Sequence, residues 1–597
     1  MSGKRNGSRI ARAAPVPIDL LLASGERMQW SGDLAAAERT YRRALETHPH
    51  DERATQLLGV MLADRNDIDG AIDLFEAAAP HVGPVASETF GFYNNYANVL
   101  RRAGRFRSAE SILRALVAIT PRAWQGWHNL GQTLNDLERY DEAVAALRRA
   151  VMLEPAHVAN HTALGEVLHN LGRLNSAEAS LRRAIEIGGA NDHGLWTLLG
   201  KNERLLGRLD AALEAVNRAL VLSGGSAAAH RNAGVVLMEL GRFDESIAHF
   251  REAIAAEPAN IESQSYLGYA LLAAGRLAES FEPWEHAIKG GPRGIERELG
   301  VPRWTPADAD ARVLVYREQG IGDEIMLASL YPDLVNAARS VVVECDPRLV
   351  PLFTRSFPEA EVRAQTHDER RRETMHDVDR ASAAGSLIQW FRPRVEAFPD
   401  RRSYLAADPA RVEQWRARLA EVGPGPYVGI SWRSKLQTAE RRNEYTRLDE
   451  WGEVFAVPGV TWVNLQYDDC NRELRDAEKR FGAQIQRWDW LDLMNDFDEV
   501  AALTTALDLV VAPFNAVSML SGALGVRTVA MGNRYGWGEL GTGRMPWMPA
   551  IAVASRMPNE EWDAVLTAAA REVGTLAEGA SSGLEEVRVG GGISCST

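Results

Sequence analysis

Cysteine is scarce in this chain of 597 residues, and its scarcity excludes two classes of protein. The three cysteines, Cys345, Cys470 and Cys595, are far apart and lack the paired spacing of zinc ligands. They therefore predict neither a structural zinc site nor a disulfide-stabilised extracellular domain, and they favour a reducing compartment. The chain also has no run of about 18 apolar residues, so we expect no membrane-spanning helix.

An excess of basic residues is also absent. The sequence has 67 Lys and Arg against 81 Asp and Glu, and its formal net charge is −14. Because a nucleic-acid partner requires a basic face, we expect none. The basic residues 1–17 include Pro15 and Pro17, which break the apolar stretch there, so we expect a disordered N-terminus rather than a signal peptide. These features predict a globular cytoplasmic protein of several domains.

A periodicity of about 34 residues runs through residues 18–290. Small residues recur at this pitch, each followed 16 residues later by a larger apolar residue, and a glycine often lies seven residues after the small one. Small residues let two antiparallel helices approach closely, and no such hairpin can bury its apolar face alone, so we expect a stacked superhelix. The small series is Gly25, Gly59, Ala97, Gly131, Gly165, Gly200, Gly234 and Gly268, and the larger series is Tyr41, Phe75, Leu113, Leu147, Leu181, Val216, Phe250 and Trp284.

This pattern closely resembles the tetratricopeptide repeat, an all-α superhelix whose groove binds proteins. Asn95, Asn129 and Asn232 lie two residues before the small residue of their repeats, on the face that such superhelices turn inward. The O-GlcNAc transferases, which this chain resembles in layout, hold the backbone of their acceptor with asparagines there. An amide both donates and accepts hydrogen bonds, so the three residues are candidates for acceptor binding. The alternative is ordinary solvated helix surface.

The repeat pattern stops after Trp284, and we expect a linker at 291–310, with Pro283 kinking or shortening the last helix and Trp304 packing between the two halves. Strand patterns then alternate with helical ones, which predicts parallel sheets. The number of units favours two doubly wound lobes, at 311–405 and 406–575, followed by a flexible tail at 576–597. The expected strands are 312–316, 341–344, 427–431, 460–465, 507–511 and 527–531, and the expected helices include 323–338, 448–455, 473–481, 498–506 and 516–524.

The order of motifs in this half resembles a group of repeat-fused bacterial glycosyltransferases. EQGIGDEIMLASLYPDL is followed by GISWRS, VNLQY, NDFDEVAALTTALDLVVA and SGALG. The catalytic half of such enzymes is similar to the heptosyltransferases and has a two-lobed GT-B fold, and some relatives modify flagellin. The resemblance covers residues 18–290 and 300–570. It implies transfer of a sugar from a nucleotide donor to Ser or Thr of a protein, plausibly flagellin, without a cofactor.

The resemblance also implies the base for the acceptor hydroxyl. The aspartate of the matching GD motif is the proposed base in the heptosyltransferases, and here it is Asp323. At the first turn of a helix this carboxylate is alternatively a cap with a low pKa, which makes it a weak base. Gly320 and Gly322 permit close approach of the backbone to a bound anion.

Further donor-binding candidates follow strand ends. Arg433 and Lys435 would point toward the cleft and offset charge on the departing phosphate, or else form a surface salt bridge. Gln466 and Tyr467 are candidates for the base or ribose. Asn515 and Ser518 open a helix whose free amides would bind a phosphate. Asp496 and Asp498 form a DxD pair that is more typical of a helix cap than of a metal site, so we expect no metal.

Two positions depart from the heptosyltransferase pattern. Where those enzymes carry Asp and, five residues later, His, this chain has Phe514 and Met519. The pair of threonines that contacts the donor phosphates in the O-GlcNAc transferases is also missing. The departures leave a second interpretation open, in which the chain is a non-catalytic scaffold or secretion adaptor with a degenerate transferase domain.

Overall fold

The computed structural model describes residues 16–288, 296–365, 375–435, 444–534, 536–558 and 560–579. The chain forms two compact units, with the boundary between Asn202 and Glu203, and each is described separately. Residues 1–15 of the expected disordered segment 1–17, residues 580–597 of the tail 576–597 and residues 291–295 of the linker 291–310 lie outside the described residues. In the part of the chain that was searched, no helix is both long enough and apolar enough to cross a membrane.

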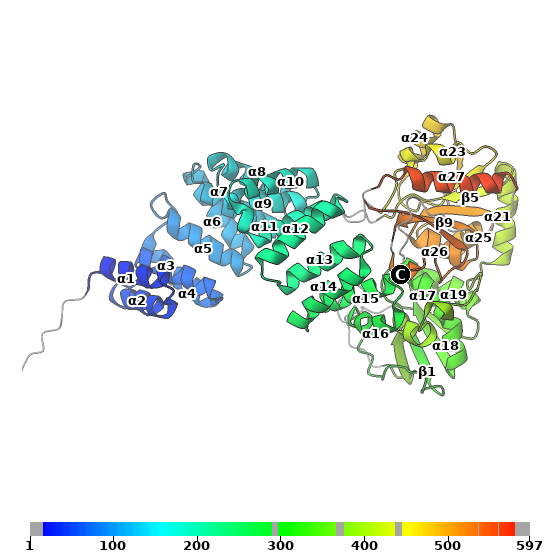
Figure 1. The fold of residues 1–597 in the computed structure, drawn as a ribbon, viewed down its shortest axis with the longest axis horizontal. Helices are drawn as coiled ribbons and strands as arrows, with labels where there is room; N and C mark the ends of the chain where they lie inside the picture. Colours follow the sequence, from blue (N-terminus) through cyan, green and yellow to red (C-terminus); the bar gives the residue numbers. More distant parts are fainter. Residues whose placement is uncertain are drawn as a thin grey trace, which may run out of the picture. The chain divides into compact units, whose positions relative to one another are not determined.

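Paired antiparallel helices form the repeats, as the periodicity predicts (Figure 1). The first unit contains the helices up to α10 and most of α11, and the second unit begins at the end of α11. The bounds are α1 Ile18–Trp30, α2 Leu34–Thr47, α3 Glu52–Asp64, α4 Ile68–Val82, α5 Phe90–Arg102, α6 Phe106–Ile119, α7 Trp124–Asp136, α8 Tyr140–Leu153, α9 Val158–Asn170, α10 Leu174–Glu186, α11 His193–Leu205, α12 Leu209–Leu222, α13 Ala227–Glu239, α14 Phe243–Ala256, α15 Ile261–Ala273 and α16 Leu277–His286.

In most repeats whose small residue is glycine, that glycine meets the large side chain inside the hairpin. A Cβ atom added at Gly59 would lie 2.4 Å from the ring of Phe75, and one added at Gly131 would lie 2.4 Å from Leu147. Both bulky partners are fully buried. The glycine series therefore does what the sequence predicts, because only a hydrogen side chain leaves room for the large residue of the second helix. Helix α16 has 10 residues and contains Pro283, which confirms the expected shortening.

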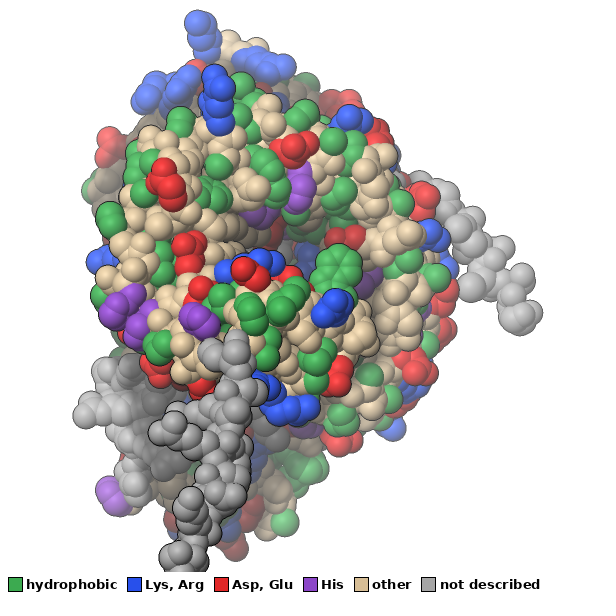
Figure 2. Space-filling view, turned by 90° about the vertical axis from the view of Figure 1, so that its left-hand side faces the viewer, with side chains coloured by type: hydrophobic (Ala, Val, Ile, Leu, Met, Phe, Trp, Pro, Cys, Tyr) green, Lys and Arg blue, Asp and Glu red, His purple; other side chains and the backbone are tan. Residues whose placement is uncertain are grey.

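Ion pairs link successive repeats along the surface of the first unit. Arg53 contacts Glu26 at 2.9 Å, and Arg139 contacts Glu110 at 2.7 Å. Acidic and basic side chains are interspersed over the face in Figure 2, among apolar ones. Because these pairs are solvated, each contributes at most about 1 kcal/mol. The stability of the array therefore comes mainly from the buried helix contacts.

Two parallel sheets follow the repeats in the second unit. The first has the order β3-β2-β1-β4, and the second has the order β10-β9-β8-β5-β6-β7. Counted within the second sheet this is the order 3-2-1-4-5-6 of doubly wound nucleotide-binding folds. The strands are β1 Arg312–Tyr316, β2 Ser340–Cys345, β3 Glu361–Ala364, β4 Arg380–Ala383, β5 Tyr427–Ile430, β6 Thr461–Asn464, β7 Ile485–Gln486, β8 Leu509–Pro513, β9 Thr528–Asn533 and β10 Ile551–Arg556.

Helices cover both faces of the second sheet. Helices α21 (Pro409–Val422), α25 (Phe497–Thr505) and α26 (Ala516–Ala523) share a core with one face. Helices α23 (Gly452–Phe455), α24 (Asn471–Phe481) and α27 (Asp563–Ala577) share a core with the other (Figure 1). The second lobe is therefore doubly wound, as expected.

The first sheet differs from that expectation. Helices α17 (Ile321–Leu327), α18 (Tyr331–Ala337) and α19 (Val350–Ser356) pack against one face. Among the described residues, the other face is covered by Ile288, Leu299, Met375 and Val378, none of which lies in a helix. The single helix expected over 323–338 is wrong as well. A 3-10 turn at Ala328–Leu330 divides it, next to Pro332, which lacks the amide of a continuous helix.

Trp304 joins the repeats to the first sheet, as the sequence predicts. Its side chain is 2% exposed and stacks on Phe391, with ring centroids 5.8 Å apart. It belongs to one hydrophobic core together with Leu272, Leu277 and Trp284 of the last repeat. The last repeat and the sheets of the second unit therefore form a continuous packed body.

Candidate functional site

A cavity of about 700 Å³ lies in the second unit, where the carboxyl ends of strands from both sheets face the last repeats. Repeat side chains and loop residues line it together. The cavity therefore brings together residues of the repeats and residues of the strand-and-helix half, which are separate patterns in the sequence. The lining includes Arg204, Met238, Glu239, Tyr266 and Tyr269 of the repeats, Gly320, Gly322 and Asp323 after β1, Tyr467 after β6, Asn515 after β8, and Trp537 and Glu539 of the 3-10 helix η7 (Trp537–Glu539).

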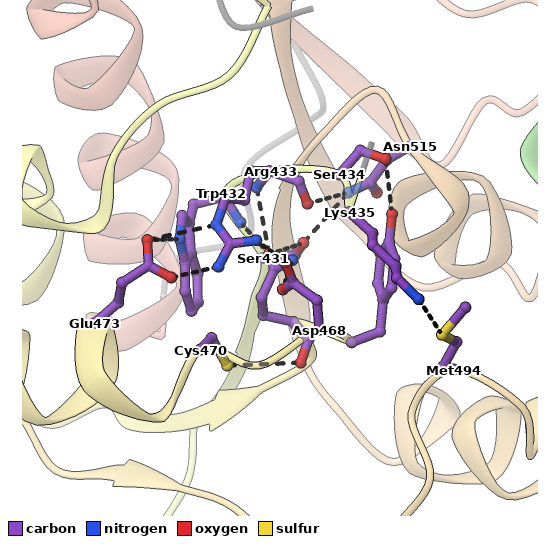
Figure 3. Close-up of polar contacts among 12 residues, drawn as sticks. Ser431, Trp432, Arg433, Ser434, Lys435, Asp468, Cys470, Glu473, Met494 and Asn515 are labelled. Carbon is purple, nitrogen blue, oxygen red and sulfur yellow. Dashed lines mark hydrogen bonds and ion pairs between the residues drawn. The ribbon is translucent and has the colours of Figure 1, made fainter. Parts of the chain in front are cut away.

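The topology of the second sheet explains where this cavity forms. Strands β5 and β8 are neighbours, and the chain leaves them toward opposite edges of the sheet. A crevice opens at such a switch point, at the carboxyl ends of the strands. Asn515 bridges it by donating from Nδ2 to Ser431 Oγ at 3.3 Å and to the Arg433 carbonyl at 3.4 Å (Figure 3).

The segment after β1 brings three of the predicted residues into the cavity wall. Gly320 is the N-cap of α17, and Asp323 is half-buried in the first turn. A Cβ atom added at Gly322 would lie 3.5 Å from the backbone nitrogen of Ala516, the first residue of α26. The starts of α17 and α26 therefore face each other across the two lobes. Gly320, Gly322, Asp323 and Asn515 share one cavity, and their roles stay predictions.

The start of α26 is less open than the sequence predicts. The Oδ1 atom of Asn515 accepts from the amides of Val517 and Ser518, at 2.9 and 3.3 Å. The Ser518 side chain is fully buried and hydrogen-bonds back to Asn515. These two amides are therefore already occupied by the cap. The expectation that Ser518 and its amide would bind a phosphate directly does not fit this geometry.

Neither Arg433 nor Lys435 is among the residues that line the cavity. The Arg433 guanidinium forms ion pairs with Asp468 and Glu473 (Figure 3). The Lys435 ammonium lies 3.6 Å from the sulfur of Met494. The salt-bridge alternative therefore describes Arg433, because its charge is offset by two carboxylates. The expected direction of Arg433 was therefore wrong, and donor binding by Lys435 stays a prediction.

Replacing Arg433 by methionine tests this structural role. The variant leaves Asp468 and Glu473 without their cation, and we expect it to lower the free energy of unfolding by about 1–3 kcal/mol. Lys435→Met is the control and should change it by less than about 0.5 kcal/mol. Urea unfolding measures both. Equal effects of the two substitutions would contradict the structural role.

Gln466 and Tyr467 have different positions. Gln466 is 1% exposed, and its Oε1 atom accepts from Ser431 Oγ at 3.0 Å and from the Trp432 amide at 3.1 Å. It fixes the loop after β5 rather than lining the main cavity. Tyr467 does line it and donates to Ser434 Oγ at 3.0 Å. Both also border a smaller cavity of about 230 Å³ beside the ends of β6 and β7.

Glu539 is a site residue that sequence reasoning missed. It is 5% exposed and lines the main cavity, and its Oε1 atom accepts from the Gly536 amide at 3.0 Å. Burial raises the pKa of its carboxyl group to about 7, against the smaller lowering effects of that amide and of Arg534. The sequence around it, WGEL, has no motif that marks the glutamate. Only the fold, by burying it, distinguishes it from other glutamates.

The predicted acceptor-binding asparagines lie on repeat helices. In the first unit, Asn95 donates to Gln56 Oε1 at 3.3 Å, and Asn129 donates to Asn94 Oδ1 at 2.9 Å. In the second unit, Asn232 is half-buried on α13 and is not among the cavity-lining residues. The first two amides are therefore partly used in contacts between repeats, and acceptor binding by the three remains a prediction.

The two departures from the heptosyltransferase pattern lie at the cavity itself. Phe514 and Met519 both line it. A Cβ atom added at Gly532 would lie 2.6 Å from the Phe514 ring, so this glycine makes room for the ring.

The DxD pair of the sequence, Asp496 and Asp498, lies at the start of α25. Asp496 accepts from the Glu499 amide at 3.1 Å and caps α25, and Asp498 pairs with Arg355.

Comparison with known proteins identifies the repeats. One tetratricopeptide repeat model matches residues 31–84, 96–158, 197–261 and 231–293. A second such model matches residues 134–201. Protein FlbA of Caulobacter vibrioides (strain ATCC 19089 / CIP 103742 / CB 15) is 39% identical over 264 residues, which span 42% of this chain and 44% of that protein. The match thus spans less than half of this curated relative.

Two solved structures are similar in part. One is the APC/C hetero-tetramer Cut9-Hcn1, with 20% identity, a TM-score of 0.36, and coverage of 42% of this chain and 48% of that one. The other is a tetratricopeptide repeat protein from Parabacteroides merdae ATCC 43184, with 14% identity, a TM-score of 0.35, and coverage of 42% and 98%. Residues 31–84 and 96–293 of this chain are tetratricopeptide repeats.

Proposed function

We propose that this chain is a protein O-glycosyltransferase with a GT-B catalytic half. It takes a nucleotide sugar as donor and Ser or Thr of a protein as acceptor, and the repeats hold that protein. The single observation that carries the proposal is the shared cavity: Asp323, the glycine turn at 320–322 and the start of α26 line the same space as repeat residues Tyr266 and Tyr269. A transferase of this kind requires donor and acceptor surfaces to meet at one place.

The arrangement of the lobes supports the two sides of the reaction. Parallel sheets bind nucleotides at the carboxyl ends of their strands, and both sheets present those ends to the cavity. The Asn515 cap accepts from the amides of Val517 and Ser518 but not from that of Ala516, which faces Gly322. Met238, Tyr266 and Tyr269 of the repeats line the same cavity. The donor phosphates therefore belong between the lobes, and the acceptor belongs beside the repeats.

The reaction follows from this geometry. The acceptor hydroxyl gives its proton to a carboxylate and attacks the anomeric carbon, while the bond from that carbon to the phosphate oxygen breaks and the nucleotide leaves as an anion. The resemblance implies Asp323 as the base. Since Arg433 is offset by Asp468 and Glu473, the backbone of the glycine turn at 320–322 and the amide of Ala516 are the better candidates for stabilising the leaving anion. We propose that the chemistry needs no metal or other cofactor.

The proposed partner is a cytoplasmic acceptor protein, with flagellin as the first candidate because relatives that the sequence resembles modify it. The second candidate function is a scaffold or secretion adaptor whose catalytic half does not turn over. Phe514 and Met519 favour it, since they make apolar the part of the cavity wall where the heptosyltransferases carry Asp and His. The two functions share protein binding by the repeats and differ in donor use.

A donor test separates them. The full chain is mixed with UDP-N-acetylglucosamine, GDP-mannose, ADP-glucose and CMP-N-acetylneuraminic acid, and its melting temperature is measured. A transferase should be stabilised by one of the four, by about 2.7 kcal/mol at a concentration 100 times the Kd. That donor should then add the mass of its sugar to flagellin purified from cells that lack this chain.

Asp323→Asn is the matched variant. It should lower the rate of sugar transfer by about 100-fold or more while the chain keeps its melting temperature. Glu561→Gln, at an exposed residue outside the cavity, is the control and should keep the rate. No stabilisation by any donor and an unchanged mass of flagellin would support the scaffold instead.

A further inference from the structure

We propose that Glu539 is a catalytic carboxylate of this site and accepts the proton of the acceptor hydroxyl. The inference rests on the proposed function and moves the base from Asp323 to Glu539. Neither the repeat models nor the motifs that resemble glycosyltransferases contain this residue. It lies in a short helix after the last motif, and the fold brings it to the cavity.

The surroundings of Glu539 place it on the acceptor side. Trp537, in the same 3-10 helix, packs against Tyr269 and Trp284 of the last repeat, with ring centroids 6.2 and 5.3 Å apart. The turn between α15 and α16 also touches this segment, because a Cβ atom added at Gly275 would lie 2.9 Å from the Leu540 carbonyl oxygen. Glu539 is therefore held between the lobes and the repeats that would present the hydroxyl.

The carboxyl group has one oxygen fixed and one left for a substrate. The Gly536 amide donates to Oε1, and Oε2 has no hydrogen-bond partner among the residues that the structure describes. The fixed oxygen orients the group, so the other can meet a hydroxyl that enters from the repeat side. A glutamate held in this way satisfies the first requirement of a general base, which is geometry.

The chemistry of the two carboxyl groups also differs. Asp323 lies in the first turn of α17, where the helix dipole favours an anion. Burial raises the pKa of Glu539 to about 7, which matches a base that works near neutral pH. Asp323, opposite the start of α26, would instead orient the donor sugar.

The other charged and titratable groups of the cavity are accounted for. Arg534 is the charged group that acts on Glu539, and it lowers the pKa. Glu239 is bonded to Arg204 at 2.6 Å, and Glu444 is exposed. The remaining titratable residues lining the cavity are Tyr266, Tyr269, Tyr445, Tyr467 and Asp323.

The transfer step balances with Glu539 as base. The hydroxyl oxygen forms a bond to the anomeric carbon, its proton goes to Oε2 of Glu539, and the bond between that carbon and the phosphate oxygen breaks with the electron pair leaving on the nucleotide. No oxidant, reductant or metal enters. The protonated glutamate returns its proton to water when the product leaves.

The test is the pH dependence of sugar transfer to flagellin by the full chain, with whichever of the four nucleotide sugars the wild type uses. The wild-type rate should rise with pH through about 7 and then level off, because only the ionised carboxylate accepts a proton. Glu539→Gln should lower the rate by about 100-fold or more and remove this rise. The amide keeps an oxygen for the Gly536 amide, so the variant should fold.

Two comparison variants make the outcome decisive. Asp323→Asn should lower the rate but keep the rise near pH 7, and Glu561→Gln should keep both rate and profile. Retention of the rise in Glu539→Gln, or its loss in Asp323→Asn, would overturn the inference while leaving the transferase function intact. If the wild type transfers sugar from none of the four donors, the proposed function fails and this inference fails with it.

Discussion

The Glu539→Gln variant is expected to be more stable than the wild type at pH 8 and equally stable at pH 4. In the folded chain burial raises the pKa of Glu539 to about 7, whereas its ordinary value is 4.5. Between these values the folded chain holds a proton that the unfolded chain has lost, so the stability of the wild type falls as the pH rises from about 4.5 to about 7. Glutamine has no charge to bury and escapes this fall.

The size of the effect follows from the difference between the two pKa values. Each unit corresponds to about 1.4 kcal/mol, so the variant should gain roughly 3 kcal/mol in free energy of unfolding above pH 7. Urea unfolding at pH 4, 6 and 8 measures it. Glu561→Gln, which removes an exposed charge, should follow the wild type at all three values. A constant difference between Glu539→Gln and the wild type over this range would contradict the burial of an ionisable group.

The Glu539 carboxyl group is expected to lower the free energy of unfolding at neutral pH, and a role in function would explain why it is there. Buried carboxylates are usually paired with a cation, as Glu344 is with Arg297 at 2.6 Å. No ion pair joins Glu539 to a cation among the described residues, although glutamine would be more stable there. Groups of this kind cluster at active sites, where function offsets the loss of stability. The stability experiment therefore supports or weakens the catalytic assignment without any substrate.

The repeats were the part of the fold most open to prediction, because each position carries one physical requirement. Gly59 and Phe75 are 16 residues apart in the sequence and meet inside one hairpin, so their spacing alone encodes the contact. Strand β1 was predicted at its observed bounds, 312–316, since it is a continuous buried run. Strands β3, β4, β7 and β10 were missed. Strand β3 is half-exposed and β7 has two residues, so neither leaves an apolar pattern.

The candidate site was predictable in its backbone and not in its side chains. Loops after parallel strands converge whatever their sequence, which is why Gly320, Asp323 and Asn515 line one cavity. The direction of Arg433 depends on Asp468 and Glu473, which lie 35 and 40 residues away. The sequence pattern does not show whether the Arg433 side chain pairs with these two carboxylates or extends into the cavity. The same holds for burial, which alone makes Glu539 noteworthy.

The contact between the last repeat and η7 is expected to depend on Gly541. Its φ angle is +71°, and a Cβ atom added there would lie 3.0 Å from the backbone of Ala274 and of Gly275. Alanine would cost about 1–2 kcal/mol for the left-handed conformation and about 1–3 kcal/mol for the crowding, or roughly 2–5 kcal/mol together. Because both neighbours are backbone atoms, no side chain can rotate to relieve the contact.

Gly482→Ala separates these two costs. Gly482 has a φ angle of +70°, and a Cβ atom there would meet no atom within 4 Å. This control should lose only the conformational part, about 1–2 kcal/mol, as measured by urea unfolding. Gly541→Ala should lose more and should also lower sugar transfer, because the backbone that moves carries Trp537 and Glu539 into the cavity. If the two variants lose equal stability and both keep full transfer, the repeats do not position Glu539 through this contact, and the base must be held by the lobes alone.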